Sequence, residues 1–345
     1  MKYDVKSMTL QELTEEMKDC GKPAFRAKQI YDWLHVKLVR NYGEMKNLGR
    51  DMIEYLDEHY PLYAVKPVET LTSQEDGTKK FLFELHDGNI IESVWMQYKH
   101  GNSVCISSQV GCRMGCRFCA STLDGLVRSL TPSEMLDQIY AITLLTGQKV
   151  SNVVIMGSGE PLDNYDNLLR FLTLISDEHG LNISARNITV STCGLIPRMM
   201  ELANQKLQIT LAVSLHAPNQ ERRSALMPIA NRYEIHEVVD ACRYYFEQTG
   251  RRITFEYSLV AGENDSEEDA MELAGLIRGI NCHVNLIPVN PIKERSYRES
   301  TAGAVRAFKN KLEKSGIHVT IRREMGRDIN GACGQLRRSY KEKQC

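Results

Sequence analysis

The stretch that decides the fold is GCRMGCRFC, residues 111–119, which follows a β-rich run. It spaces three cysteines, Cys112, Cys116 and Cys119, as C-x3-C-x2-C. Closely spaced thiolates on one loop are typical of an iron–sulfur cluster or a zinc ion. A closed structural zinc site takes four ligands, whereas three cysteines on a four-iron cluster leave one iron open. The spacing favours a [4Fe–4S] cluster with an open iron; the alternative is a zinc knuckle completed by a distant Cys or His.

The chain around this loop alternates between strand-like and helical stretches. The expected strands are residues 103–110, 152–156, 187–191, 208–214, 254–259, 283–288 and 318–322. The expected helices are residues 131–147, 165–178, 197–205, 235–248, 267–278 and 301–314. This alternation predicts an α/β fold with a parallel sheet, and about six repeats fit an incomplete (β/α)6 barrel better than an eight-fold one. The active site of such a fold lies at the carboxyl ends of the strands.

Three segments flank this barrel, which we expect over residues 101–322. Residues 1–62 follow helical spacing and predict an accessory helical domain. Residues 63–100 hold two β-rich runs on either side of an Asp-Gly pair, which predicts a short β-hairpin extension. Residues 323–345 are polar and basic and form a C-terminal loop and tail.

Composition excludes several classes of protein. The 345 residues carry 43 Lys and Arg against 44 Asp and Glu, a net charge of -1, so any RNA contact must come from local basic patches. One candidate patch lies within residues 22–50, and a second comprises Arg322, Arg323, Arg327, Arg337 and Arg338. No run of about 18 apolar residues is present, which predicts no membrane span. The N-terminus lacks an apolar signal region, so we expect a cytoplasmic protein whose ten cysteines serve metal or redox chemistry.

Polar and small residues recur where the expected strands end. Met156-Gly157-Ser158-Gly159-Glu160-Pro161 follows the second strand of the series, where glycine permits a close approach of backbone to a ligand. The later strand ends carry Ser191, Ser214-Leu215-His216 and Asn290. Each residue alone is commonplace, but several at successive strand ends on one face predict a ligand site.

Two cysteines outside the loop, Cys105 and Cys333, also need an explanation. Cys105 lies on the first strand and reaches the space above the loop if its side chain points into the barrel. Cys333 lies in NGACGQL, residues 330–336, whose small residues let a loop enter a narrow site. Taken singly, each fits an inert thiol better than a functional one.

The motifs together resemble a known family. CRMGCRFC resembles the cluster motif of the radical S-adenosylmethionine (SAM) superfamily, and Gly159 and Glu160 match its G-G-E-P element. ACGQL, CxSSQVGC, MGSGEPLDN and the N-terminal PAFRAKQIYDWLH resemble the radical SAM RNA adenine methyltransferases, the RlmN and Cfr enzymes. The resemblance implies a [4Fe–4S] cluster on the three loop cysteines. It implies SAM contacts from Gly159, Glu160, Ser191, Ser214, Leu215, His216 and Asn290.

The resemblance also implies a mechanism with two SAM molecules per turnover. Cys333 takes a methyl group from the first, and a radical derived from the second abstracts hydrogen from that S-methyl group. The thiomethylene radical adds to the adenine carbon, Glu92 removes the ring proton, and Cys105 attacks Cys333. That attack releases methylated RNA and leaves a disulfide, which an external reductant resets.

The family implies particular substrates and leaves alternatives. The substrates are adenosine 2503 of 23S rRNA, in the peptidyl-transferase centre, and adenosine 37 of tRNA, methylated at carbon 2. Gly-Glu-Pro-Leu-Asp-Asn and Val110 favour that product over the carbon-8 product of the resistance enzyme. Two other hypotheses stay open: a radical SAM enzyme acting on a protein or small molecule, and a zinc-dependent RNA-binding module. We expect a monomer that receives electrons from a flavodoxin or ferredoxin.

Overall fold

The N-terminal part of the protein is a compact helical unit. The structure is a computed structural model, and it describes residues 4–99, 101–289, 297–329 and 340. The unit contains η1 (Val5–Ser7), α1 (Leu10–Asp19), α2 (Phe25–His35), η2 (Tyr42–Glu44) and α3 (Arg50–His59). Thr9 begins α1 through a capping box with Glu12.

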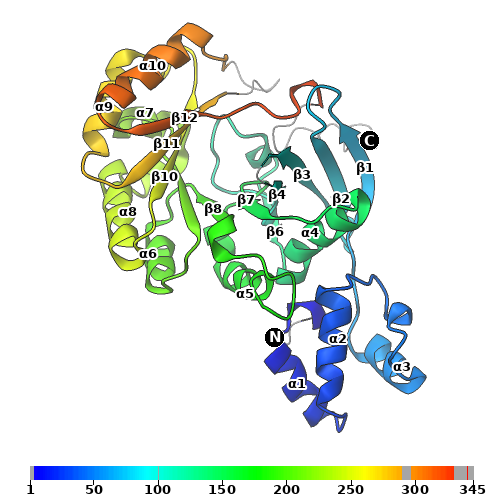
Figure 1. The fold of residues 1–345 in the computed structure, drawn as a ribbon. Coiled ribbons are helices and arrows are strands. Elements are labelled where there is room, and N and C mark those ends of the chain that lie inside the picture. Colours follow the sequence, from blue (N-terminus) through cyan, green and yellow to red (C-terminus); the bar gives the residue numbers. More distant parts are fainter. Residues whose placement is uncertain (1–3, 100, 290–296, 330–339, 341–345) are drawn as a thin grey trace.

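The rest of the molecule is built around one ten-stranded sheet (Figure 1). Its order is β1-β2-β3-β4-β7-β8-β9-β10-β11-β12. The strands are β1 (Lys66–Thr72), β2 (Lys79–Glu84), β3 (Ile90–Tyr98), β4 (Gly101–Ile106), β7 (Asn152–Ile155), β8 (Ile188–Thr192), β9 (Thr210–Ser214), β10 (Ile253–Leu259), β11 (Cys282–Pro288) and β12 (His318–Ile321). Within this sheet, β1 to β4 pair antiparallel, and the strands from β4 to β12 pair parallel.

The parallel part is the expected α/β partial barrel. Its helices lie along the outer side of the curved sheet (Figure 1). They are α4 (Pro132–Thr146), α5 (Tyr165–Ile175), α6 (Ile196–Asn204), α7 (Gln220–Leu226), α8 (Ile235–Thr249), α9 (Glu267–Leu276) and α10 (Ala302–Lys314). The strands bury Val, Ile and Leu residues between these helices and the barrel interior, as strands covered on both faces do.

The first expected strand is divided in two, and this corrects the prediction for residues 103–110. β4 ends at Ile106, and β5 (Gln109–Gly111) pairs with β6 (Leu126–Ser129) in a separate two-stranded sheet. The break is fixed by hydrogen bonds, because the Ser107 N–H donates to Gln138 Oε1 and the Ser108 N–H donates to the Ser158 carbonyl. The turn places the cysteine loop above the barrel strands.

The extension before the barrel is larger than a hairpin. β2 and β3 form the expected hairpin, and Gly88 at its turn has a φ of +79°. β1 adds an antiparallel strand that the sequence analysis missed. Its Pro67 cannot donate to a ladder, its register shifts between Pro67 and Glu69, and its side chains are half-buried or exposed. An edge strand of this kind lacks the apolar alternation that identifies a strand.

Polar contacts fasten the helical unit to the barrel. The Lys6 ammonium pairs with Asp137 on α4, with both side chains buried. His35 Nδ1 lies 2.6 Å from the Tyr140 hydroxyl, and the Tyr31 hydroxyl donates to Asp177 at 2.8 Å.

The chain after β12 returns to the extension. The Gly326 N–H donates to Asp76 at 3.0 Å, and the Gln74 N–H donates to Asp328 at 2.8 Å. Tyr340 packs beside Leu82 and Ile90. Both described portions of the C-terminal segment therefore lie against the β1–β3 extension.

Among the residues described, no helix is long and apolar enough to cross a bilayer.

Candidate active site

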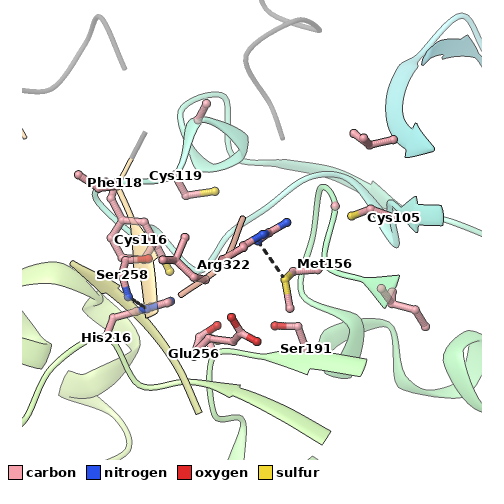
Figure 2. A pocket seen from close by; sticks show the side chains of 18 of the residues that line it. Cys105, Cys116, Phe118, Cys119, Met156, Ser191, His216, Glu256, Ser258 and Arg322 are labelled. Atoms are coloured by element: carbon pink, nitrogen blue, oxygen red, sulfur yellow. Dashed lines mark hydrogen bonds between the residues drawn. The ribbon is translucent and has the colours of Figure 1, made fainter. Parts of the chain in front are cut away.

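A cavity of about 470 Å³ lies over the carboxyl ends of the barrel strands (Figure 2). The three loop cysteines, Cys112, Cys116 and Cys119, all line it. Cys105, from β4, lines the same cavity, so the expectation that its side chain faces the space near the loop is confirmed. No disulfide joins any two of the eight cysteines in the described part of the chain, and Cys333 lies outside that part.

Local geometry holds the cysteine loop in place. Gly111 has a φ of +77°, and a Cβ there would lie 2.0 Å from the Gly125 carbonyl oxygen, so only glycine fits. The Cys112 N–H donates to that same carbonyl at 3.0 Å, and the Cys119 N–H donates to the Cys116 carbonyl at 3.1 Å. These main-chain contacts fix the path of the loop that carries the three cysteines.

The chemistry of these thiols fits a metal cluster. Burial raises the pKa of Cys112 to about 12 and the pKa of Cys116 well above its usual value, with neighbouring thiols adding to both effects. Such thiols become ligands when a metal cation displaces their protons. Soft thiolates select iron–sulfur clusters and zinc, and the adjoining cavity leaves room for a further ligand on an open iron. In the described ranges, no three His, Cys, Asp or Glu side chains are grouped as ligands of a single ion.

Gly159 and Glu160 bring a fixed carboxylate to the wall of this cavity. Gly159 has a φ of +107°, and a Cβ there would lie 2.5 Å from the Gln109 side chain. The Glu160 oxygens accept hydrogen bonds from the N–H groups of Leu162, at 3.0 Å, and Cys193, at 2.8 Å. Burial raises the pKa of Glu160, while these hydrogen bonds act in the opposite direction. The carboxylate is held rigidly and can pair with an ammonium group.

His216 contributes a neutral imidazole. Its Nδ1 accepts a hydrogen bond from the Ser258 N–H at 2.9 Å, which leaves the proton on Nε2. Burial, helped by the charge of Arg223, lowers the pKa of His216 to about 3. The ring centroids of Phe118 and His216 lie 4.8 Å apart, with the two rings nearly perpendicular. Figure 2 shows the two side chains next to each other. His216 is therefore an uncharged donor at neutral pH.

The other expected SAM-contacting residues divide into three groups. Ser191 and Ser214 line the cavity. Leu215 is fully buried in the core and is not part of the cavity lining; its N–H donates to the Glu256 carbonyl. Asn290 lies outside the described residues.

Glu92 does not line the cavity but lies beside it. It is buried on β3 and pairs with Lys80 on β2, with 3.2 Å between Nζ and Oε2. Register puts Val94 opposite both Lys80 and Cys105, so these side chains share one face of the sheet. Glu92 lies on that face two residues before Val94.

Glu256 and Arg322 line the cavity but were not among the expected catalytic or SAM-contacting residues. Glu256 is buried on β10, accepts a hydrogen bond from Asn285 at 3.0 Å, and has a pKa raised by burial. The sequence feature that could have identified Glu256 is a carboxylate inside the apolar run ITFEYSL. Arg322 lies across from it, with Nη1 3.8 Å from the Met156 sulfur (Figure 2). Arg322 was expected only as part of a basic patch.

Family models match two parts of the chain. The model of the Radical SAM superfamily matches residues 106–274, which include the cysteine loop. The model of the ribosomal RNA large subunit methyltransferase N-terminal domain matches residues 3–61.

Curated relatives match along almost the whole length. The probable dual-specificity RNA methyltransferase RlmN of Lachnospira eligens is 62% identical, over 98% of this chain and 97% of the relative. The protein of the same name from Clostridium perfringens strain 13 is 56% identical, over 98% and 97%. The crystal structure of a radical SAM methyltransferase from Sphaerobacter thermophilus superposes with a TM-score of 0.93 at 43% identity, covering 97% of this chain and 99% of that one.

Proposed function

Because the chain belongs to the RlmN family of radical SAM RNA methyltransferases, we propose that it methylates carbon 2 of adenosine in two RNAs. The targets are adenosine 2503 of 23S rRNA, in the peptidyl-transferase centre, and adenosine 37 of tRNA. Enzymes of this superfamily use a [4Fe–4S] cluster and SAM. The family assignment removes the zinc-dependent RNA-binding module as an interpretation.

One observation carries the proposal: the Cys105 thiol shares a cavity with the three cysteines of the 112–119 loop. A methyl transfer by direct displacement from SAM needs no such extra thiol. Carbon 2 of adenine is electron-poor, so its methylation requires a carrier that is not an ordinary electrophile. A thiol beside the cofactor site supports a route through protein sulfur.

We assign the cofactor residues as follows. Cys112, Cys116 and Cys119 hold the cluster, which supplies the electron that cleaves SAM. Glu160 receives the SAM amino group, because its carboxylate is buried and oriented by two main-chain donors. Gly159 allows the backbone to approach the ligand, and the remaining contacts are Ser191, Ser214, His216 and Asn290. Leu215 is not assigned a contact, because it is buried in the core and does not line the cavity. His216 donates through Nε2, because its Nδ1 is occupied by the Ser258 N–H.

We assign the transfer residues separately. Cys333 accepts the methyl group on its sulfur as S-methylcysteine and carries it to the base. Glu92 takes the ring proton, and its partner Lys80 holds the carboxylate in place. Cys105 then attacks the Cys333 sulfur: an S–S bond forms while the bond from that sulfur to the RNA methylene breaks. The methylene takes up a proton to become the methyl group, the cluster would accept the surplus electron of the radical adduct, and an external reductant opens the disulfide.

The proposal extends to the setting of the reaction. Electrons come from a flavodoxin or ferredoxin, the enzyme acts as a monomer in the cytoplasm, and no membrane is involved. RNA contacts come from the basic residues of the 22–50 segment and from the arginines that follow β12.

Product analysis tests the proposal. Anaerobically reconstituted protein is incubated with SAM, reductant and unmodified 23S rRNA or tRNA, and the RNA is digested to nucleosides. Chromatography with mass spectrometry against both standards should identify 2-methyladenosine. Finding 8-methyladenosine would show the Cfr-type reaction instead. Finding neither, with iron bound and SAM cleaved, would point to a protein or small-molecule substrate.

A further inference from the structure

Arg223 is the largest fully buried side chain in the described part of the chain. It lies on α7, and its exposed fraction is 0%. Nη2 donates to the Cys193 carbonyl at 2.7 Å, and Nη1 donates to the Tyr233 carbonyl at 3.1 Å. Nε is buried and has no hydrogen-bond partner among the described residues. The guanidinium is thus fixed by main-chain carbonyls.

The charge of Arg223 is not balanced by a salt bridge. Within the ranges that the structure describes, its recorded partners are neutral carbonyls, and no ion pair to Asp or Glu is found. Glu160 is connected only indirectly, because it accepts the N–H of Cys193 while Arg223 binds the carbonyl of the same residue. A buried charge without a partner costs several kcal/mol, so an anion is expected nearby in the working enzyme.

The cysteine loop lies against the end of the same helix. Cys116 packs in one apolar cluster with Cys193, Leu226 and Met227, and the Arg117 N–H donates to the Leu226 carbonyl at 2.9 Å. Arg223 binds the Cys193 carbonyl, and Cys116 packs against the same residue. The guanidinium and this cysteine of the loop therefore lie on either side of Cys193 in a water-excluded region.

The backbone leaves room for the guanidinium. Gly194 has a φ of +98°, and a Cβ at that position would lie 3.2 Å from Arg223 Nη2. It would also crowd Val238, at 3.1 Å. A residue with a side chain here would press on the arginine, so the turn after β8 and the arginine on α7 fit together.

We infer that Arg223 is a buried counter-charge to the iron–sulfur cluster and raises its reduction potential. This inference rests on the proposed ligand set of Cys112, Cys116 and Cys119. One-electron reduction, by the flavodoxin or ferredoxin class of donor, adds a negative charge to a group that already carries three thiolate charges. A fixed cation in a low-dielectric surrounding stabilises the reduced form more than the oxidised form.

Potentiometric titration of the reconstituted full-length protein tests this without RNA. The reduced cluster is followed by its electron paramagnetic resonance signal at a series of poised potentials. Arg223→Gln and Arg223→Met remove the charge, and Arg223→Lys keeps it. The matched control is Arg222→Gln, on the same helix, where the side chain is 42% exposed and pairs with Asp269. Iron content and SAM binding are measured for every variant.

At the same applied potential, the ratio of reduced to oxidised cluster should be at least tenfold smaller in the neutral variants than in wild type. This corresponds to a midpoint reduction potential that is lower by about 59 mV. Arg223→Lys and Arg222→Gln should stay within threefold of wild type. If neutral variants lose iron while Arg223→Lys keeps it, the charge requirement is again supported. A neutral variant with a wild-type midpoint, or a lysine variant that behaves like the neutral ones, would overturn the inference.

The two proposals fail in distinguishable ways. Detection of 8-methyladenosine, or of no methylated RNA, would contradict the proposed product and leave the midpoint comparison intact. Wild-type protein that binds iron through other residues would contradict the ligand set and the counter-charge together.

Discussion

The Lys80 ammonium and the Glu92 carboxylate form an ion pair of 3.2 Å, with side chains 0% and 2% exposed. Removing one partner leaves the other charge buried, so Lys80→Met or Glu92→Leu should each lower the free energy of unfolding by about 3–5 kcal/mol. The double variant should recover most of that loss. Urea unfolding of the four proteins measures the coupling. Lys66 on β1 and Glu84 on β2 form a more exposed pair in the same sheet and supply the control. Lys66→Ala should cost about 1 kcal/mol or less. Additive losses at Lys80 and Glu92 would refute the coupling.

Gly159→Ala should weaken SAM binding by about tenfold or more, equivalent to 1.4 kcal/mol. The added Cβ would meet Gln109 at 2.5 Å and displace the segment that carries Glu160. Gly279→Ala is the matched control, because Gly279 also has a positive φ but has no atom within 4 Å of its Cβ position. Equilibrium dialysis of SAM against the anaerobic proteins gives both affinities. If both variants lost the same SAM affinity, the effect would come from backbone strain alone and not from the contact with Gln109.

Cys112→Ala should lose the cluster and all activity, since two thiolates remain where three are needed. Iron and sulfide analysis of anaerobic protein measures this. Cys282→Ala, at the opposite, amino end of β11, should keep its iron. Full iron content in Cys112→Ala would remove that residue from the ligand set.

Cys105→Ala should accumulate RNA covalently attached to Cys333, because the sulfur that releases the product is gone. A shifted protein–RNA band that nuclease digestion collapses would identify the adduct, and peptide mass spectrometry would locate it. Cys20→Ala, in the N-terminal unit, is the control and should release methylated RNA normally. Normal release from Cys105→Ala would assign the resolving step to another group.

His35 makes stability depend on pH. Burial lowers its folded-state pKa to about 3, against about 6.5 when unfolded, so below pH 6.5 the unfolded chain binds a proton that the folded chain does not. The contribution of neutral His35 to the free energy of unfolding is full above pH 6.5. It falls as the pH drops, by about 2 kcal/mol between pH 7 and 5. His35→Gln should lose less stability over that interval than wild type does. His59→Gln, at an exposed site, should follow wild type, and parallel curves for all three would contradict the argument.

The sequence was sufficient for features that depend on local patterns. Periodicity located the barrel strands and the barrel helices other than α7, which at seven residues is too short to show a helical period. The Asp-Gly pair located the β2–β3 turn. The cysteine spacing also identified the loop at the cavity. It could not show that residues 107 and 108 would turn the chain, because that turn is fixed by Gln138 and Ser158 from distant segments.

Local sequence patterns also could not predict which charged residues the fold would bury. Lys80 appeared as one of two adjacent lysines and Arg223 as one of two adjacent arginines, typical of solvated surfaces. Only the fold buries one member of each pair. Glu256 carried a visible signal, since a carboxylate interrupts an apolar strand, and it was overlooked because no motif included it.

The attachment of the C-terminal segment to the β1–β2 turn couples two regions that are 250 positions apart in sequence. Inserting or deleting residues between Ser73 and Thr78 would move the acceptor that Asp76 offers to Gly326. Natural or engineered changes in the length of that turn should therefore be accompanied by compensating changes after β12. Chimeras that exchange the extension between relatives would need to exchange the end of the chain with it.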